Sequence, residues 1–122
     1  MRVLITGAGG FVGGHLVDHL LTRPEIEIHA AVLEPPGQNP RLDDRPVAQH
    51  MLDLRQPDAV RDALASARPD LLFHLAALAD VGASFKDPWH TLENNIIAQI
   101  NVLEAVRMLR LPTRILIVSS AE

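Results

Sequence analysis

An α/β fold with a doubly wound parallel sheet of five strands is predicted by three observations. Short apolar runs alternate with longer stretches in which apolar residues recur at helical spacing. Two of these runs, residues 71–73 and 115–118, lack polar alternation, which is typical of strands buried on both faces. A glycine-rich segment, residues 7–13, stands directly between the first strand and the first helix. The sheet is expected to be parallel because each crossover helix returns the chain to the start of the next strand.

The individual elements follow from local patterns. Strands are predicted where β-branched and aliphatic residues gather, at residues 2–6, 26–33, 47–54, 70–75 and 114–118. Helices are predicted at residues 11–23, 57–67 and 88–109. The first helix ends before Pro24, because a residue that precedes proline avoids the helical region. Pro57 suits the first turn of its helix, where the backbone N–H has no partner in any case.

Two segments are expected to be loops, and one helix face is expected to be core. Residues 34–46 carry four of the nine prolines, and Lys86 is placed in a second loop. The long helix carries apolar residues at helical spacing, and we expect most of this stripe to be buried; its members are Leu92, Ile96, Ile100, Leu103 and Val106.

Composition bounds the class of protein. The 122 residues are 48% hydrophobic and 21% charged, which predicts one globular domain over residues 1–122. No cysteine is present, so disulfides and metal–thiolate sites are excluded, and a reducing compartment such as the cytoplasm fits. The net charge of −4 disfavours nucleic acid as a partner, and no apolar run approaches the ~20 residues of a membrane span. His15 and His19 lie one helical turn apart without a third ligand, so no metal site is predicted.

The glycine segment predicts a nucleotide site of the Rossmann type. Gly7 permits a tight turn, Gly10 lets a diphosphate approach the backbone, and Gly13 lets the helix pack close to the sheet. The N–H groups at the start of the helix then face the phosphates. An isolated glycine triplet is equally compatible with a plain strand-to-helix turn, but the flanking strand and helix favour dinucleotide binding.

Glu34 bears on the choice of dinucleotide. It ends the second predicted strand, where such sites carry an acid that accepts hydrogen bonds from the adenosine ribose. A carboxylate there repels a 2′-phosphate and favours NAD. Two alternatives stay open: Glu34 is a solvated loop residue beside Pro35, or Arg41 or Arg45 folds back onto a phosphate, in which case NADP is bound.

Several separated segments resemble, in the same order, the extended short-chain dehydrogenase/reductase family, in particular its NAD(P)-dependent nucleotide-sugar epimerases and dehydratases. They lie at residues 6–13, 53–54, 74–88, 94–105 and 118–122. Together with the glycine segment and Glu34, the resemblance implies these cofactor contacts: Gly7, Gly10, Phe11, Val12, Gly13, Glu34, Asp53, Leu54, Leu75, Ala76, Ala77, Ala79, Asn94, Asn95 and Ser119. It also implies a nucleotide-sugar substrate and a homodimer.

The resemblance implies two catalytic residues as well. Ser120 stands where the family keeps a hydroxyl on the 4-oxygen of the sugar, whose C4 exchanges a hydride with the nicotinamide; a strand cap is the alternative role. Glu122 stands where several 4,6-dehydratases carry the base that removes the C5 proton, although Ala121 lacks the acid that some of them place between the two. Ala79 departs from members that carry a polar ribose contact there.

A larger departure concerns the family's Tyr-x-x-x-Lys pair. The chain has no tyrosine, and Lys86 is its one lysine, so this pair is absent. We therefore expect the N-terminal part of a longer enzyme, inactive by itself. The alternative is a non-catalytic dinucleotide-binding module that senses redox state or binds a partner protein, and the sequence beyond Glu122 would discriminate between them.

Overall fold

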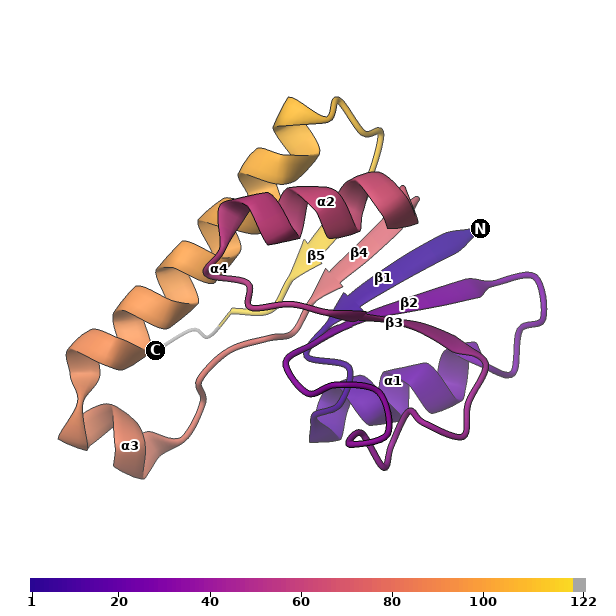
Figure 1. The fold of residues 1–122 in the computed structure, drawn as a ribbon. Coiled ribbons are helices and arrows are strands. Elements are labelled where there is room, and N and C mark those ends of the chain that lie inside the picture. The colour runs from indigo at the N-terminus through magenta and orange to yellow at the C-terminus, as the bar shows by residue number, and fades with distance from the viewer. Residues whose placement is uncertain (120–122) are drawn as a thin grey trace.

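The computed structural model describes residues 1–119 and confirms the predicted fold class. Its five strands form one parallel sheet in the order β3-β2-β1-β4-β5 (Figure 1). The strands are β1 (Arg2–Thr6), β2 (Glu27–Val32), β3 (Val47–Met51), β4 (Leu71–His74) and β5 (Arg114–Ile117). The chain moves outward from β1 to β3 and then crosses to the other side of β1, so the direction of the strand order reverses beside β1.

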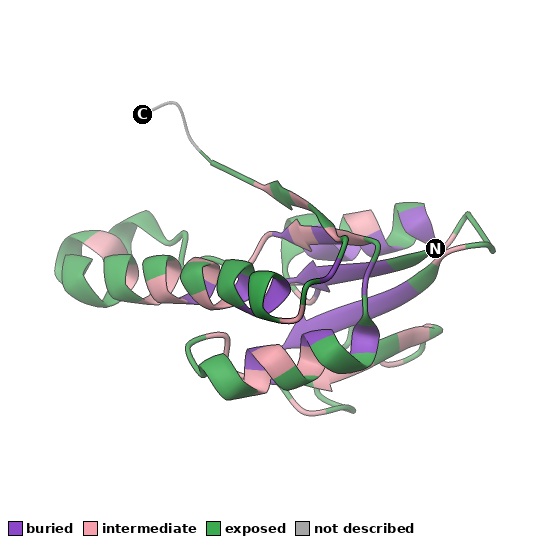
Figure 2. Ribbon diagram, turned by 90° about the horizontal axis from the view of Figure 1, so that it is seen from above, coloured by how far each residue is buried: buried purple, intermediate pink, exposed green. Residues whose placement is uncertain are grey.

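Helices cover both faces of the sheet. The helices are α1 (Phe11–Leu20), α2 (Pro57–Ala67), α3 (Val81–Lys86) and α4 (Pro88–Met108). Figures 1 and 2 show α1 on one face and α2 with α4 on the other, and the strands β1 and β2 between them are largely buried. Val17 of α1 packs in one apolar cluster, and Leu64 of α2 with Val102 of α4 pack in the other. None of the helices in residues 1–119 is both long and apolar enough to cross a lipid bilayer.

Helix α3 is a difference from the sequence prediction. Lys86 is the last residue of this helix and does not lie in a loop. The carboxylate of Asp80 accepts a hydrogen bond from the backbone N–H of Ala83 and so caps the helix. The helix has only six residues, none of them buried, and a segment this short carries too little of an apolar repeat for a helix to be predicted.

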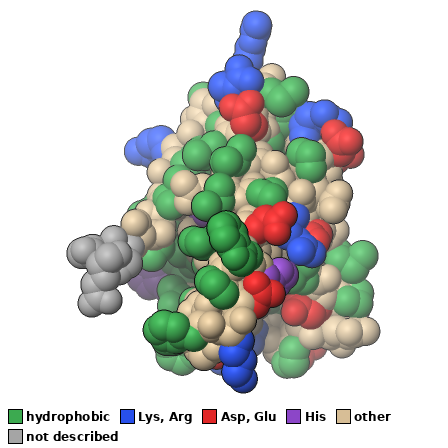
Figure 3. Space-filling view, turned by 90° about the vertical axis from the view of Figure 1, so that its left-hand side faces the viewer, with side chains coloured by type: hydrophobic (Ala, Val, Ile, Leu, Met, Phe, Trp, Pro, Cys, Tyr) green, Lys and Arg blue, Asp and Glu red, His purple; other side chains and the backbone are tan. Residues whose placement is uncertain are grey.

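The apolar stripe of α4 is also placed differently from the prediction. Leu92, Ile96 and Ile100 are each more than half exposed, and only Val106 of the five stripe residues is buried. The side of α4 that meets the sheet and α2 consists of smaller residues, Ala98, Val102, Ala105 and Val106. Small side chains let the helix axes approach closely, so the larger ones point outward. Figure 3 shows hydrophobic side chains gathered on the side of the molecule where α3 and the start of α4 lie.

Candidate functional site

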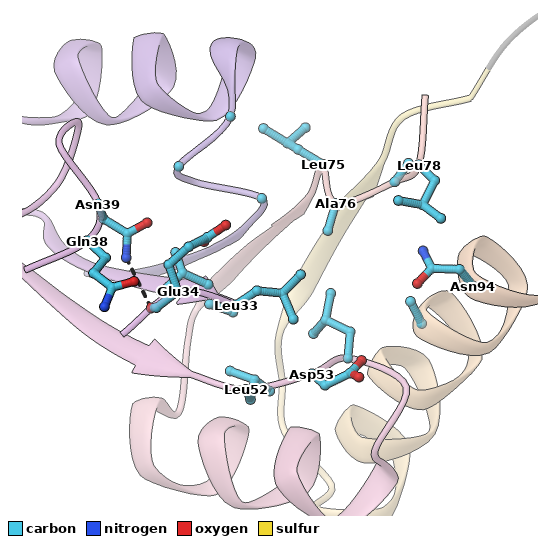
Figure 4. A pocket seen from close by; sticks show the side chains of 18 of the residues that line it. Leu33, Glu34, Gln38, Asn39, Leu52, Asp53, Leu75, Ala76, Leu78 and Asn94 are labelled. Carbon is cyan, nitrogen blue, oxygen red and sulfur yellow. Dashed lines mark hydrogen bonds between the residues drawn. The ribbon is translucent and has the colours of Figure 1, made fainter. Parts of the chain in front are cut away.

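A pocket of about 490 Å³ opens at the carboxyl ends of the strands, beside β1 where the strand order reverses (Figure 4). Open α/β sheets place their ligands at this point. The glycine loop, the segments after β2, β3 and β4, and helix α4 all contribute to its wall. The lining residues are Gly7, Gly9, Gly10, Ala31, Val32, Leu33, Glu34, Gln38, Asn39, Pro40, Leu52, Asp53, Leu54, Leu75, Ala76, Ala77, Leu78, Asn94 and Ala98.

The glycine loop is held by close backbone contacts. Gly7 has φ of +71°, and the N–H of Gly10 donates to its carbonyl oxygen at 3.0 Å. A Cβ atom at Gly7 would lie 2.9 Å from the nitrogen of Ala76, and one at Gly13 would overlap the Gly7 carbonyl. These two glycines therefore let the loop and α1 pack against their neighbours. Gly10 is less constrained, since its φ of −74° is open to any residue, but a Cβ atom there would still lie 3.2 Å from the Gly7 carbonyl oxygen, which is a tight contact.

The N-terminus of α1 is open on the side of the pocket. Gly10 is the N-cap residue, no side chain caps the helix, and its first turn carries no acidic residue. The first N–H groups of the helix thus lack a side-chain partner and add to the positive end of its dipole. Such an end binds an anion, phosphate above all. Phe11 and Val12 offer only these backbone groups, because their side chains are exposed and do not line the pocket.

The hydroxyl of Thr6 fixes the floor of the pocket. Its oxygen accepts hydrogen bonds from the N–H groups of Leu75 and Ala76, at 3.1 Å each, and lies 2.9 Å from Nδ1 of His74. Because the Thr6 oxygen already accepts two N–H groups, its one proton is left to donate to Nδ1 of His74, and burial lowers the pKa of His74, which favours the neutral ring that can accept it. Thr6 thereby joins the ends of β1 and β4 and sets the position of the backbone opposite Gly7.

Helix α4 is joined to the segment after β4 by an asparagine. The side-chain amide of Asn95 donates to the Leu78 carbonyl at 3.1 Å and accepts from the Leu78 N–H at 2.8 Å. Asn95 thus holds the pocket wall without lining it. Asn94 does line the pocket, and its Nδ2 donates to the Asn95 side chain at 3.2 Å.

Asp53 lines the pocket two residues after β3 ends. The Arg55 guanidinium binds both of its carboxylate oxygens, at 2.7–3.1 Å, and the Arg55 N–H donates to one of them. These hydrogen bonds lower the pKa of Asp53. Its carboxylate is therefore ionised and already accepts several hydrogen bonds. Next to it, the Leu54 carbonyl accepts from Nδ2 of Asn101 at 2.9 Å, which ties this segment to α4.

Glu34 lines the pocket close to the end of β2, whereas Arg41 and Arg45 do not line it. The Arg41 guanidinium lies 5.9 Å from the centre of the Phe11 ring, over α1. Arg45 forms an ion pair with Asp18 of the same helix. The cations of this loop are thus directed at α1, and the negative Glu34 faces the pocket.

The structure brings together nine of the cofactor residues predicted from the sequence. Those that line the pocket are Gly7, Gly10, Glu34, Asp53, Leu54, Leu75, Ala76, Ala77 and Asn94; those that do not are Phe11, Val12, Gly13, Ala79, Asn95 and Ser119. The two predicted catalytic residues, Ser120 and Glu122, lie outside the described residues.

Sequence reasoning missed part of the wall and the side chains that position it. Gly9, Gln38 and Asn39 line the pocket, and the only signal for them is their place in a glycine-rich and a proline-rich segment. Within residues 1–119, no three histidine or acidic side chains are grouped so that they could hold a metal ion.

The sequence matches the NAD dependent epimerase/dehydratase family over residues 3–122. The chain belongs to this family. The resemblance noted from its separated segments is thereby confirmed.

Individual relatives of the family support the assignment. A UDP-glucose 4-epimerase from Thermus thermophilus, solved as a complex with NAD, is 35% identical with a TM-score of 0.82, over 91% of this chain and 35% of that one. A UDP-glucose 4-epimerase from Thermotoga maritima, solved with UDP-glucose, is 26% identical with a TM-score of 0.86, over 98% and 38% of the two chains. A GDP-6-deoxy-D-mannose reductase from Pseudomonas aeruginosa is 32% identical over 99% of this chain and 34% of the reductase. The chain thus spans about a third of the length of these relatives.

Proposed function

We propose that this chain is the cofactor-binding portion of an NAD(P)-dependent nucleotide-sugar epimerase, dehydratase or reductase. The observation that carries the proposal is the pocket at the reversal of the strand order, with the uncapped N-terminus of α1 at its edge. The relative from Thermus thermophilus was solved as a complex with NAD, which supports a dinucleotide as the ligand.

The residues present fit such a cofactor. Uncapped N–H groups at the start of α1 suit its diphosphate, beside the Gly9–Gly10 backbone. Glu34 would accept from the adenosine ribose, and Asp53 with Leu54 would border the adenine. Ala76 and Asn94 would lie along the nicotinamide half. When bound, the nicotinamide supplies the acceptor and donor for a hydride.

We favour NAD over NADP because of the charges around the pocket. Glu34 lines it, while no lysine or arginine is among its lining residues in the described part of the chain. A 2′-phosphate would therefore meet a carboxylate without a compensating cation.

The chemistry on the sugar is assigned to residues that follow β5. Ser120 would hold the 4-oxygen of the sugar while C4 exchanges its hydride, and Glu122 would act as a base in a dehydratase. β5 is parallel to β4, so the chain leaves it at the same edge of the sheet as the pocket. The sequence holds no tyrosine to move the hydroxyl proton. We therefore expect no turnover from this chain alone, and a cytoplasmic homodimer for the enzyme that contains it.

Calorimetric titration of the purified chain with NAD, and separately with ADP-ribose, tests the proposal. We expect both ligands to bind, because the residues proposed to contact the adenosine and the diphosphate, Glu34, Asp53 and the Gly9–Gly10 backbone, all line this pocket. If neither NAD nor ADP-ribose gives a heat of binding in these titrations, dinucleotide binding by this chain is refuted. Incubation with UDP-glucose and NAD completes the test, since measurable turnover would contradict the expected need for a tyrosine.

A further inference from the structure

Three polar side chains behind the ribose end of the pocket form a relay of hydrogen bonds. Nε2 of Gln49 donates to Oδ1 of Asp43 at 3.2 Å, and Oε1 of Gln49 accepts from Nδ2 of Asn39 at 3.1 Å. Nδ2 of Asn39 also donates to the Glu34 carbonyl at 3.1 Å. Asn39 is only 4% exposed and lines the pocket. The relay thus runs from the carboxylate of Asp43 to a buried amide in the pocket wall.

The relay determines which atom of Asn39 faces the glycine loop. Both acceptors next to Nδ2, the Glu34 carbonyl and Oε1 of Gln49, require the nitrogen to stay where it is. The amide oxygen is then directed away from them (Figure 4). It lies 3.2 Å from the position that a Cβ atom would take on Gly9, a residue of the pocket. The ribose end of the wall therefore presents two acceptors, the Glu34 carboxylate and Oδ1 of Asn39.

Asp43 fixes the orientation of the whole relay. An ionised carboxylate accepts hydrogen bonds and cannot donate them. Asp43 accepts from the N–H groups of Gly37 and Asn39, at 2.9 and 2.8 Å, as well as from Gln49. If Gln49 turned its amide over, its oxygen would oppose the carboxylate, and its nitrogen would oppose Nδ2 of Asn39. If Asn39 alone turned over, its oxygen would oppose two other oxygens. The hydrogen bond from Gly37 is the main reason why the pKa of Asp43 is lowered, so the group stays ionised at neutral pH.

We propose that Asp43 and Gln49 are positioning residues that select a dinucleotide with a free ribose diol over one with a 2′-phosphate, by holding the amide oxygen of Asn39 toward the pocket. The inference rests on the proposed function, because it presumes that the pocket binds a dinucleotide. Two acceptors match the two hydroxyl donors of a diol. A phosphate needs donors, and the relay keeps the Asn39 amide protons away from it.

The ratio of two dissociation constants tests the proposal. Binding of NAD and of NADP is measured by calorimetry for the wild type and for the Gln49→Met and Asp43→Asn variants. Gln49→Met keeps the volume and the charge but removes one of the two acceptors that hold Nδ2 of Asn39; of the two, the Glu34 carbonyl remains, so the Asn39 amide can turn its protons toward a phosphate at a lower cost. We expect the Kd ratio, NADP over NAD, to fall about tenfold in both variants, which corresponds to the net contribution of about one hydrogen bond. The affinity for NAD should change only a few-fold.

Asp44→Asn is the matched control. Asp44 is adjacent and exposed, so this variant removes the same charge as Asp43→Asn and leaves the relay intact. We expect its Kd ratio to stay within about twofold of the wild type, because exposed charges are well screened. Thermal unfolding of each variant reports on folding, and the neutral Gln49→Met carries the test if Asp43→Asn does not fold.

The outcomes separate the inference from the proposed function. A purely structural role for the relay would weaken NAD and NADP equally and leave the ratio unchanged, which would overturn the inference alone. A wild type that prefers NADP would also overturn it. A wild type that binds neither NAD nor ADP-ribose would instead remove the proposed function, and the inference with it.

Discussion

The hydroxyl of Thr6 lies 2.9 Å from Nδ1 of His74, and this buried pair joins the carboxyl ends of β1 and β4 beneath the pocket. The same hydroxyl accepts from two backbone N–H groups of the following segment. One oxygen therefore contacts three polar groups, the buried His74 ring and two part-buried N–H groups, of which the Leu75 N–H also donates to the Thr6 carbonyl oxygen at 3.3 Å. Unpaired buried groups of this kind are costly, so the pocket floor depends on this single side chain.

Replacing Thr6 by valine keeps the shape of the side chain and removes the hydroxyl. We expect the free energy of unfolding to fall by about 2 kcal/mol, since the buried His74 ring and the part-buried Ala76 N–H lose this hydrogen bond. Urea denaturation followed by circular dichroism measures the change. Thr22→Val is the matched control, because the Thr22 hydroxyl bonds the His19 carbonyl at an exposed position. Its effect should be below about 0.5 kcal/mol, and equal effects at both sites would contradict the role given to Thr6.

Stability should depend on pH through two histidines, the buried His74 and the half-buried His50. Burial lowers the pKa values of His74 and His50 below the ordinary value of 6.5. Below pH 6.5 the unfolded chain then binds more protons than the folded one, so stability rises with pH there. The stabilisation is complete above pH 6.5 and is lost as the pH falls toward the folded pKa values.

Urea midpoints between pH 5 and pH 7 measure this dependence for the wild type and for His74→Asn. We expect a shallower slope in the variant, because one of the two groups no longer titrates. His90 is exposed, so the His90→Asn variant should show the same dependence of the urea midpoint on pH as the wild type. A wild type whose stability is flat or falls over this range would show that neither histidine is kept neutral by the fold.

The predictable part of the molecule is the part that local patterns encode. Strand β1, the glycine loop and Glu34 follow from residue type and order, because turn geometry and strand burial leave a signature in neighbouring residues. The prediction for the stripe on α4 is wrong, since periodicity identifies an apolar face without saying which face meets the sheet. Ala98 and Ala105 take that contact because they are small, and nothing local marks them as core.

The polar contacts behind the pocket leave no local signature. Thr6 and His74 are 68 positions apart, and Asn39 and Gln49 are 10 apart across an irregular loop. Their pairing depends on strand register, which requires the folded sheet. The sequence predicts a loop at residues 34–46, but not that Asn39 is buried in a pocket wall or that Arg41 lies over Phe11.

Gly10→Val tests the diphosphate site. The φ of Gly10 suits any residue, and a Cβ atom there would lie 3.2 Å from the Gly7 carbonyl oxygen, so we expect the protein to fold after a small shift of the loop, while the side chain occupies the space in front of the first N–H groups of α1. The affinity for NAD should fall by about 100-fold or more, because lost diphosphate contacts include charge-assisted hydrogen bonds. Calorimetry measures it. Gly82→Val makes the same substitution in α3, away from the pocket, and should leave the affinity unchanged.

The exposed face of α4 predicts a self-association surface. Ile96 and Ile100 are 53% and 52% exposed, and apolar groups of this size are usually covered. We expect the enzyme that contains this chain to sediment as a dimer in sedimentation velocity. The Ile96→Glu variant should sediment as a monomer, because the substitution places a charge in an apolar contact. Met51→Glu introduces the same charge at another exposed apolar residue and should leave the dimer intact. A monomeric wild type, or equal effects of both substitutions, would count against this surface.

Ser120→Ala tests the chemistry proposed for the complete enzyme. The serine hydroxyl would contact the 4-oxygen of the sugar during hydride transfer, so its loss should lower kcat by about 100-fold, as removal of a positioned donor commonly does. The Kd of NAD should be unchanged, because this group is assigned to the sugar and not to the cofactor. Steady-state kinetics with the nucleotide-sugar substrate measures the effect. Ser66→Ala, on the exposed side of α2, is the control and should keep the wild-type rate. A Ser120→Ala enzyme with full kcat would remove this hydroxyl from the mechanism while leaving the dinucleotide site in place.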